Sequence, residues 1–355
     1  MTNQDTLINF VRLGIGHSVD ELPTLVDWGG VEVLAKQHGL WGVLFDGVER
    51  LPQKNRPSQV VWLRWIGEVI RSYEQQYSLY RKAVADLGAW YHAHGYRMML
   101  LKGLACGLDW PRPEHRPYGD IDIYLFGQYK EADDVIARKL GIKIDNSHHH
   151  HTVFQWQGFT VENHFDFINV HHQKSNVELE KVLKELAYQD TSSIIPNPSN
   201  IVLPSSNLHA LFLIKHLVNH FAAEKITLRQ ILDWAFFVKA HTKEIDWPWL
   251  IGVLEKYHMK EFFDCVNAIC VKDIGFDTSI FPYVQFNPIV KQRIINDILN
   301  PSFSETEPTH FWKRIHFRYR RWKANEWKHE LCYNESMSSS FWSGVKSHLL
   351  KPSSI

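Results

Sequence analysis

The stretch of sequence that decides the fold is Arg116-Pro-Tyr-Gly-Asp-Ile-Asp-Ile-Tyr-Leu125. Alternate side chains of an extended strand share a face, so Asp120 and Asp122 point to one side and the neighbouring isoleucines point to the other. The apolar side of such a strand packs into a core. We therefore expect a rigid strand that presents a pair of carboxylates.

This pair of carboxylates has two interpretations. It suits divalent cations, because Mg²⁺ and Mn²⁺ prefer oxygen ligands and because nucleotidyl or phosphoryl transfer uses two ions about 3.5–4 Å apart that must be bridged. An Asp-x-Asp pair also fits the solvated face of an edge strand. Other segments of the chain must show which of the two interpretations holds.

A second strand is predicted at residues 159–167, after a turn at Gln157-Gly158. Its apolar residues alternate with Glu162, His164 and Asp166, which places those three side chains on one face. A third carboxylate can therefore join the first two if the strands are neighbours. Between the strands, Tyr129 to Leu140 is predicted to form a helix that ends at a glycine.

An apolar run precedes both strands at residues 97–103. It is predicted to form a strand, then a Lys102-Gly103 turn, then a short helix that Pro111 ends. Backbone N–H groups at such a turn and at a helix N-terminus can receive phosphate oxygens.

Together these segments resemble one family. Leu-Leu-Lys-Gly at 100–103, Gly-Asp-Ile-Asp at 119–122 and Val-Glu-Asn-His at 161–164 occur in an order similar to that of the uncharacterised nucleotidyltransferases of the DNA polymerase β-like superfamily. The similarity continues through residues 228–234 and 245–247. It covers about residues 25–350 of the chain.

The resemblance implies an enzyme that moves a nucleoside monophosphate from an NTP to a hydroxyl acceptor, with Mg²⁺ or Mn²⁺ as cofactor. By position, Asp120, Asp122 and Glu162 would be the catalytic, metal-binding carboxylates. The acceptor is left open between a small molecule, an RNA 3′ end and a protein side chain.

The resemblance also implies nucleotide-binding residues, namely Lys102, Gly103, Arg116 and His164. The first two would lie at the phosphate turn, and Arg116 with Lys102 would neutralise phosphate charge as pyrophosphate leaves. The superfamily usually has a Gly-Ser or Gly-Gly-Ser turn where Lys102-Gly103 stands here. Lys102 would compensate for this difference by placing its positive charge against a phosphate oxygen.

The predicted fold class is α+β, with a small mixed β-sheet nucleotidyltransferase core flanked by N-terminal helices and by a larger C-terminal helical region. Residues 1–94 have helical periodicity, including a long pattern from Val60 to His94. Residues 95–190 form the predicted catalytic core. Residues 205–300 are again helical, and residues 301–355 form a basic, aromatic segment.

Further boundaries follow from turn and cap residues. A helix is expected from Asn176 to Tyr188, and residues 195–206 form a turn-rich connector. Ser206 or Asn207 is expected to cap a helix that runs to about Ala223.

Composition excludes several classes of protein. Acidic and basic residues number 39 each, so no global charge attracts nucleic acid. The 4 cysteines show no C-x-x-C spacing, which argues against a zinc knuckle or a disulfide framework. The first residues lack the pattern of a secretory signal, and no apolar run is long enough to span a membrane, so we expect a cytoplasmic protein.

Histidines form two patterns. His148 to His151 are contiguous, which does not by itself define a tetrahedral metal site, but His150 or His151 is a candidate to face the nucleotide because the run leads into a predicted strand at 152–157. His209, His216 and His220 share one face of a helix. Hydrogen bonding in the core or between domains is the expected use of that face, although His216 or His220 would reach a bound phosphate if the helix covers the cleft.

Residues 310–329 alternate basic and aromatic side chains, with Glu326 as the single acidic residue. This composition suits RNA or single-stranded nucleic acid, through phosphate contacts and base stacking. It also suits a helix on an anionic membrane, or a helix whose aromatic rings pack on the catalytic domain. The three interpretations stay open at this level.

Two other functions compete with catalysis. A nucleotide-binding regulatory or interaction module would retain the carboxylates with little turnover. An all-helical interaction protein, in which the Asp-x-Asp pair is accidental, would contain no central sheet.

Overall fold

The computed structural model describes residues 1–19, 21–23, 25–171, 173–189, 201–282, 285–301, 303 and 308–334. The described residues form two compact units. The helical unit takes its residues from 1–70, 213–242 and 247–337, and the sheet unit takes its residues from 71–212 and 243–246. The four-part division predicted from the sequence stays a prediction.

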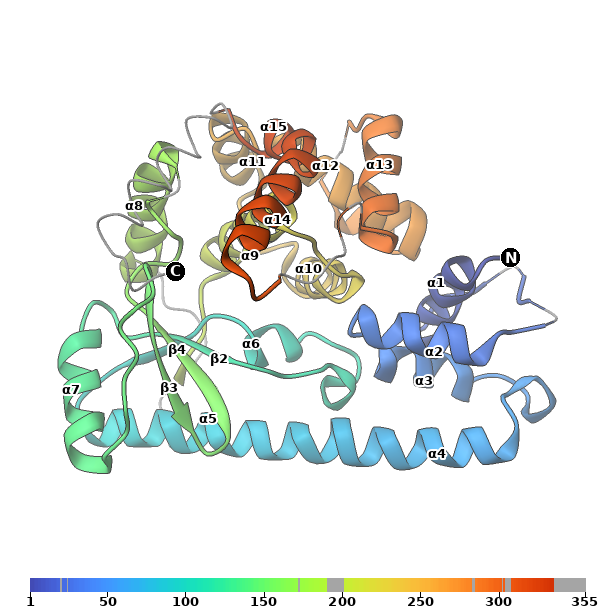
Figure 1. The fold of residues 1–355 in the computed structure, drawn as a ribbon, viewed down its shortest axis with the longest axis horizontal. Coiled ribbons are helices and arrows are strands. Elements are labelled where there is room, and N and C mark those ends of the chain that lie inside the picture. The colour runs from blue at the N-terminus through green and yellow to red at the C-terminus, as the bar shows by residue number, and fades with distance from the viewer. Residues whose placement is uncertain are drawn as a thin grey trace. The chain divides into compact units, whose positions relative to one another are not determined.

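Helices make up the helical unit (Figure 1). They are α1 (Asn3–Gly14), α2 (Trp28–Gln37), α3 (Trp41–Glu49), α4 (Gln59–Val69), α10 (Leu228–His241), α11 (Trp247–Lys256), α12 (Lys260–Ile269), α13 (Pro288–Leu299), α14 (Phe311–Ala324) and α15 (Glu326–Cys332). Helix α9 (Ser206–Ala223) contributes residues to both units.

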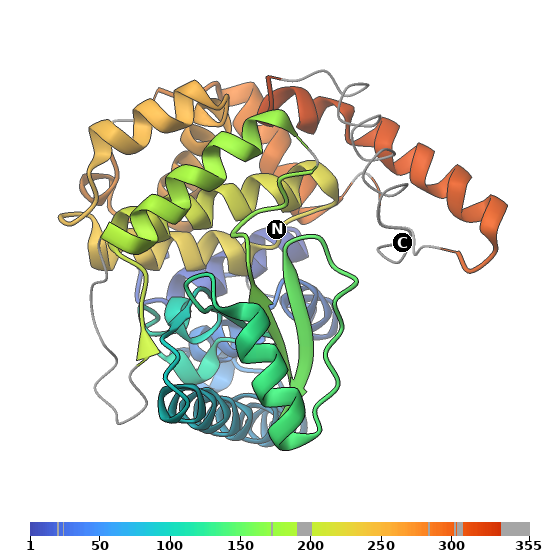
Figure 2. The ribbon, with the colours of Figure 1, turned by 90° about the vertical axis from the view of Figure 1, so that its left-hand side faces the viewer.

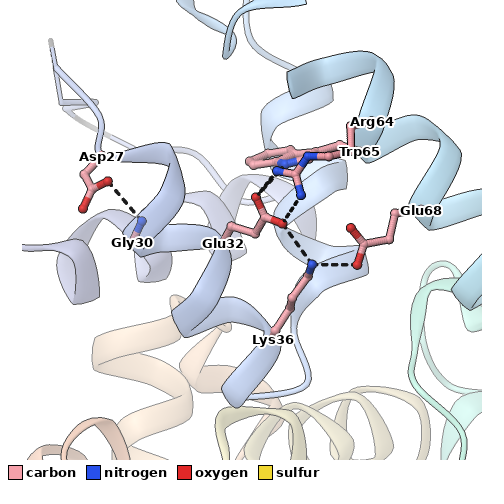
Figure 3. A network of polar contacts seen from close by, with 7 residues as sticks. All are labelled: Asp27, Gly30, Glu32, Lys36, Arg64, Trp65 and Glu68. Atoms are coloured by element: carbon pink, nitrogen blue, oxygen red, sulfur yellow. Dashed lines mark hydrogen bonds and ion pairs between the residues drawn. The ribbon is translucent and has the colours of Figure 1, made fainter. Parts of the chain in front are cut away.

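A polar network joins α2 to α4 inside the helical unit (Figure 3). The carboxylate of Glu32 accepts hydrogen bonds from the guanidinium of Arg64 and from Trp65 Nε1 at 2.9 Å. Lys36 Nζ lies 2.9 Å from Glu32 Oε1 and 2.7 Å from Glu68 Oε1. Burial opposes ionisation of Glu32, but these donors outweigh it and lower the pKa of its carboxyl to about 2.

The long helical pattern predicted from Val60 to His94 is present, with one irregularity. Helix α4 passes through a π-helical turn at Ile70–Glu74 into α5 (Gln75–Ala93). The helix ends before Gly95, whose φ of +83° is a backbone conformation that glycine adopts readily.

A mixed sheet forms the centre of the sheet unit. Its strands are β1 (Met98–Leu100), β2 (Ile121–Tyr124), β3 (His151–Trp156), β4 (Phe159–His164) and β5 (Ile201–Val202), in the order β3-β4-β2-β1-β5. Strands β2 and β4 are parallel, as are β1 and β5, while β1 with β2 and β3 with β4 are antiparallel. The sheet confirms the predicted α+β class and excludes the all-helical alternative.

One face of this sheet is apolar and is packed against α5 and α7 (Tyr129–Leu140), which Figure 1 and Figure 2 show beside the strands. Ile121, Ile123 and Val161 point into this core. Asp133 of α7 accepts hydrogen bonds from Thr152 Oγ1 at 2.7 Å and from Asn163 Nδ2 at 2.9 Å, so one carboxylate fixes α7 to two strands. The opposite face is therefore left for the polar side chains.

Two predictions, one of a strand and one of a connector, were wrong in detail. The predicted strand at 159–167 ends at His164, because the backbone N–H groups of Phe165 and Asp166 turn to the carbonyl of His150, at 3.0 and 3.2 Å. The predicted connector at 195–206 contains β5, which is only two residues long and forms through pairing with β1. Residues 195–200 of that connector lie outside the described residues.

Helix boundaries agree with the sequence to within a few residues. Helix α7 has the predicted bounds and ends at Gly141, whose φ is +67°. Helix α8 spans Lys174–Gln189 and contains the predicted 176–188. The cap of α9 is Ser205 rather than Ser206 or Asn207, because Ser205 Oγ accepts from the N–H of Leu208 at 3.3 Å. Helix α6 (Leu104–Gly107) follows the Lys102-Gly103 turn.

In the described part of the chain, no helix combines the length and the apolar character needed to cross a membrane.

Candidate functional site

The polar face of the sheet collects side chains from three neighbouring strands. In the parallel pair, Asp122 of β2 is directly beside Glu162 of β4. In the antiparallel pair, His151 of β3 is directly opposite His164 of β4. Register partners share a face, so this pairing gathers two carboxylates and two imidazoles on one surface.

Asp122 is the most buried acidic residue of this group, with 5% of its surface exposed. Its Oδ1 lies 2.6 Å from Lys102 Nζ and 3.2 Å from His164 Nε2. Burial would raise the pKa of the Asp122 carboxyl, but the Lys102 ammonium and the His164 hydrogen bond outweigh it and hold the pKa well below its usual range. Asp122 is therefore a carboxylate already surrounded by positive charge.

Glu162 lies at the edge of the same group, with its side chain 26% exposed. Its Oε2 is 3.5 Å from His164 Nε2 and its Oε1 is 4.0 Å from His151 Nε2. Burial opposes ionisation, but the hydrogen bond from His164 lowers the pKa of Glu162. The two carboxylates thus contact the same imidazole.

His164 links the carboxylates to each other. Its Nδ1 lies 3.3 Å from the carbonyl oxygen of Asp166, on the far side of the ring from Asp122 and Glu162. Burial would lower the pKa of His164, but hydrogen bonds to Asp122 and Glu162 raise it, which favours the imidazolium form between two carboxylates.

Asp120 lies at the solvent-exposed start of β2. Tyr80 of α5 donates its hydroxyl proton to the backbone carbonyl of Asp120 at 2.9 Å, which fixes the main chain there. Burial raises the pKa of Asp120, and the nearby charges of Glu162 and Asp122 raise it further. Asp120 thus ionises less readily because of the negative charge of the other two carboxylates.

The turn at Lys102-Gly103 requires glycine for two reasons. Gly103 has φ +62° and ψ −109°, where an L side chain is strained. A Cβ at this position would also lie 2.2 Å from the hydroxyl oxygen of Tyr80. The turn that brings Lys102 to Asp122 therefore depends on close contact between the backbone and α5.

Arg116 is buried, with 3% of its surface exposed. It donates to the carbonyl oxygen of Pro117 at 3.1 Å, and its guanidinium lies 5.1 Å from the ring of Tyr118. Burial raises the pKa of Tyr80, the Asp122 charge adds to this rise and the Arg116 guanidinium opposes it. Arg116 thus lies beside Tyr118, whose ring is 4.8 Å from that of Tyr80.

The histidine run adds His150 and His151 to the site, which the sequence offered only as candidates to face the nucleotide. His150 and His151 bring their rings to 5.5 and 5.2 Å from the ring of His164. Burial lowers the pKa of His150 to about 2 and that of His151 to about 4, so both rings are neutral at pH 7. The sequence contained one signal for this placement, namely the predicted strand that follows the histidine run. The pairing of that strand with β4 could not be predicted, because the tertiary structure sets its register.

The donor atoms of the site form two overlapping groups. One ligand atom each from Asp122, Glu162 and His164 lies within 4.8 Å of the other two, and the same holds for His150, His151 and His164. The first group offers two carboxylates and one imidazole. Oxygen-rich sets of this kind suit Mg²⁺ and, with a nitrogen ligand, Mn²⁺.

The other predicted histidine pattern lies in α9. His216 and His220 bring their rings to 4.3 Å from each other, and His209 Nε2 lies 3.9 Å from Cys106 Sγ. His209 is buried and makes an internal contact, whereas His216 is half-buried and His220 is exposed, so internal hydrogen bonding by the whole face stays a prediction.

The basic, aromatic segment forms α14 and α15. Lys328 is buried, and its Nζ lies 2.6 Å from Asp297 Oδ2 and 2.9 Å from the carbonyl oxygen of Glu224. The guanidinium of Arg293 lies 3.9 Å from the ring of Trp327. Part of the segment therefore packs internally, while Trp312 remains exposed. Binding of nucleic acid by this segment stays a prediction.

Comparison with known proteins gives one match. No curated protein and no solved structure matches this chain. Residues 24–272, more than half of the chain, match the family described as uncharacterised nucleotidyltransferase. This range includes the sheet with Asp120, Asp122 and Glu162, and we conclude that the chain belongs to the uncharacterised nucleotidyltransferase family.

Proposed function

We propose that this protein transfers a nucleoside monophosphate from an NTP to a hydroxyl acceptor, with Mg²⁺ or Mn²⁺ held by Asp120, Asp122 and Glu162. The observation that carries the proposal is the parallel register of β2 and β4, which sets Asp122 beside Glu162 on the polar face. Family membership supports the same reaction class.

The donor set fits a divalent cation. Two carboxylates that lie side by side on rigid strands repel each other unless a cation lies near them. Lys102 Nζ, 2.6 Å from Asp122 Oδ1, and His164 supply that positive charge in the structure. The same carboxylates would attract a divalent cation, which would take the place of Lys102 at Asp122.

The roles of the protein groups follow from their positions. Divalent ions would supply charge stabilisation of the triphosphate and a lower pKa for the acceptor hydroxyl. Lys102 is a flexible point charge, so its ammonium can turn from Asp122 to a phosphate oxygen. Arg116, whose guanidinium lies 5.1 Å from the ring of Tyr118, would add positive charge as pyrophosphate leaves. His164 keeps Asp122 and Glu162 oriented through its hydrogen bonds.

The test is transfer of label from each α-³²P-labelled NTP, with Mg²⁺ or Mn²⁺ and cell extract as the source of acceptor. The double variant Asp120→Asn/Asp122→Asn keeps side-chain size and removes the charge. Transfer is expected to fall by at least about 10³-fold, since several kcal/mol of stabilisation depend on metal ions in such reactions.

The matched control is Asp134→Asn, an exposed carboxylate on α7 outside the polar face, which should transfer label as the native protein does. The chemistry of the labelled product identifies the acceptor as a small molecule, an RNA or a protein. If NTP binds with the metal but no label moves in any extract, the nucleotide-binding regulatory module becomes the better account of the fold.

A further inference from the structure

Three imidazoles gather at one end of the strand pair β3 and β4. We call His150, His151 and His164 the three-imidazole cluster. One ring nitrogen from each lies within 4.8 Å of those of the other two. The ring of His151 is 4.4 Å from that of His150 and 5.2 Å from that of His164. The cluster is compact although its members come from two separate segments of sequence.

The backbone holds the cluster rigidly. His151 and His164 are paired across the antiparallel ladder. The carbonyl oxygen of His150 accepts from the N–H groups of Phe165 and Asp166, at 3.0 and 3.2 Å. All three residues are therefore fixed to the end of β4 by main-chain hydrogen bonds, which is the support that a preorganised ligand set needs.

Two ring nitrogens of the cluster have no hydrogen-bond partner among the residues that the structure describes. Nδ1 of His150 and Nδ1 of His151 are buried and make no hydrogen bond to any described residue. A buried polar atom without a partner costs about 1–3 kcal/mol, and an ion that binds there is one explanation for retaining such atoms. His164 is oriented differently, because its Nδ1 faces the carbonyl oxygen of Asp166 at 3.3 Å. A backbone carbonyl on one ring nitrogen is the usual partner of a metal-binding histidine.

We propose that the three-imidazole cluster binds a late first-row divalent metal ion such as Zn²⁺, through one nitrogen each of His150, His151 and His164. Three imidazoles are a common set of protein ligands for zinc, with a fourth position left for water or another group. Mg²⁺ prefers oxygen ligands, so this site differs in chemistry from the carboxylate pair. The inference goes beyond nucleotidyl transfer and stands without it.

The position of the cluster has one consequence for the carboxylates. His164 belongs both to the cluster and to the group with Asp122 and Glu162. A metal ion on His164 replaces the Nε2 hydrogen bond to Asp122 Oδ1, which spans 3.2 Å. Zinc binding and the charge state of the carboxylate pair are therefore coupled through one imidazole.

The test uses the full chain without an affinity tag, stripped of metal by a chelator. Zn²⁺ affinity is measured by competition with a chromophoric chelator, with millimolar Mg²⁺ present and no nucleotide. The native protein is expected to bind one Zn²⁺ per chain. The variant His150→Gln/His151→Gln should lose affinity by at least about 10- to 100-fold, the loss that even an outer-shell change around a metal ligand causes.

The matched control is His149→Gln, which shortens the same histidine run at a residue whose ring lies 5.4 Å from that of His171, and it should keep the native affinity. Equal loss in both variants would overturn the proposal, because the run would then bind metal without the fold. Native protein that binds Zn²⁺ no more tightly than His150→Gln/His151→Gln would overturn it as well.

A spectroscopic readout guards against misfolded variants. Co²⁺ in the native site should show the strong visible bands of a low-coordinate ion, and His151→Cys should add a thiolate-to-cobalt charge-transfer band. Absence of that band from folded His151→Cys protein loaded with Co²⁺ would remove His151 as a ligand. None of these readouts requires transferase activity, so failure here leaves the proposed transfer reaction untouched.

Discussion

Gly103 is the residue on which the Lys102 turn depends. Gly103→Ala is expected to destabilise the protein by about 1–3 kcal/mol, because a positive φ strains an L side chain. The added Cβ would also meet the Tyr80 hydroxyl at 2.2 Å. Thermal unfolding of Gly103→Ala measures the loss.

Tyr80→Phe separates the two causes of that loss. Tyr80→Phe alone loses the hydrogen bond to the Asp120 carbonyl and is therefore the reference. Relative to it, the double variant Gly103→Ala/Tyr80→Phe keeps the φ strain of +62° without the hydroxyl overlap, so it should lose only part of what Gly103→Ala costs the native protein. Full native stability of Gly103→Ala alone would show that the turn has another conformation.

Lys102 competes with any cation for Asp122. Removing the ammonium in Lys102→Met should raise the affinity for Mn²⁺ in the absence of nucleotide by on the order of tenfold, the equivalent of one charge-assisted hydrogen bond. The same change should weaken binding of NTP, because a phosphate-directed charge is lost. Electron paramagnetic resonance of free Mn²⁺ measures the first effect and equilibrium dialysis of labelled NTP the second. A fall in both affinities would contradict the competition.

At the scale of elements, α8 is joined to the segment that follows β4 by one buried carboxylate. Glu180 accepts from the N–H groups of Phe167 and Ile168, at 3.0 and 3.1 Å. Burial raises the pKa of Glu180 to about 7, although these N–H groups oppose the rise. The unfolded carboxyl titrates near its ordinary value of 4.5, so between about pH 4.5 and pH 7 the folded state binds more protons than the unfolded state.

The free energy of unfolding should therefore fall by up to about 3 kcal/mol between pH 5 and pH 8 relative to Glu180→Gln, which cannot ionise. Urea unfolding of both proteins across this range measures the difference. Glu178→Gln, an exposed position on the same helix, is the control and should run parallel to the native curve. Parallel curves for Glu180→Gln and the native protein would refute the proton uptake.

The contact between α2 and α4 has the opposite pH dependence. Because the pKa of Glu32 is lowered to about 2, its contribution is present above pH 4.5 and is lost as the pH falls toward 2. Glu32→Gln should cost about 1–3 kcal/mol at pH 7, since it weakens the bonds from Arg64 and Trp65. The cost should shrink below about pH 4. Thermal unfolding at pH 7 and pH 3, with Glu255→Gln on α11 as an exposed control, checks both statements.

At the scale of the whole molecule, a bound nucleotide should stabilise the native state by mass action. With Mn²⁺ and a non-hydrolysable NTP at about 100 times its dissociation constant, the free energy of unfolding should rise by about 2.7 kcal/mol. Asp122→Asn should lose this rise and Asp134→Asn should keep it. An equal rise in both variants would place the metal and nucleotide elsewhere.

Local pattern was enough to predict much of the fold. The period of two at Asp120 to Leu125 and the helical period at 129–140 predicted β2 and α7, because these signals depend only on neighbouring residues. The family resemblance came from the motifs at 100–103, 119–122 and 161–164, and the match over residues 24–272 confirms it. Strand β5 was missed, since two residues give no pattern of their own.

The sequence by itself determined most of the elements, the placing of Asp120 and Asp122 on one side of a strand, and the family. Only the tertiary structure decided that Lys102 contacts Asp122 at 2.6 Å and that His150 and His151 join His164. The physical reason is that side-chain alternation is a local property of a strand, whereas the register between β3, β4 and β2 is set by residues far apart in sequence. Contacts made across that register, such as the three-imidazole cluster, cannot be read from spacing along the chain.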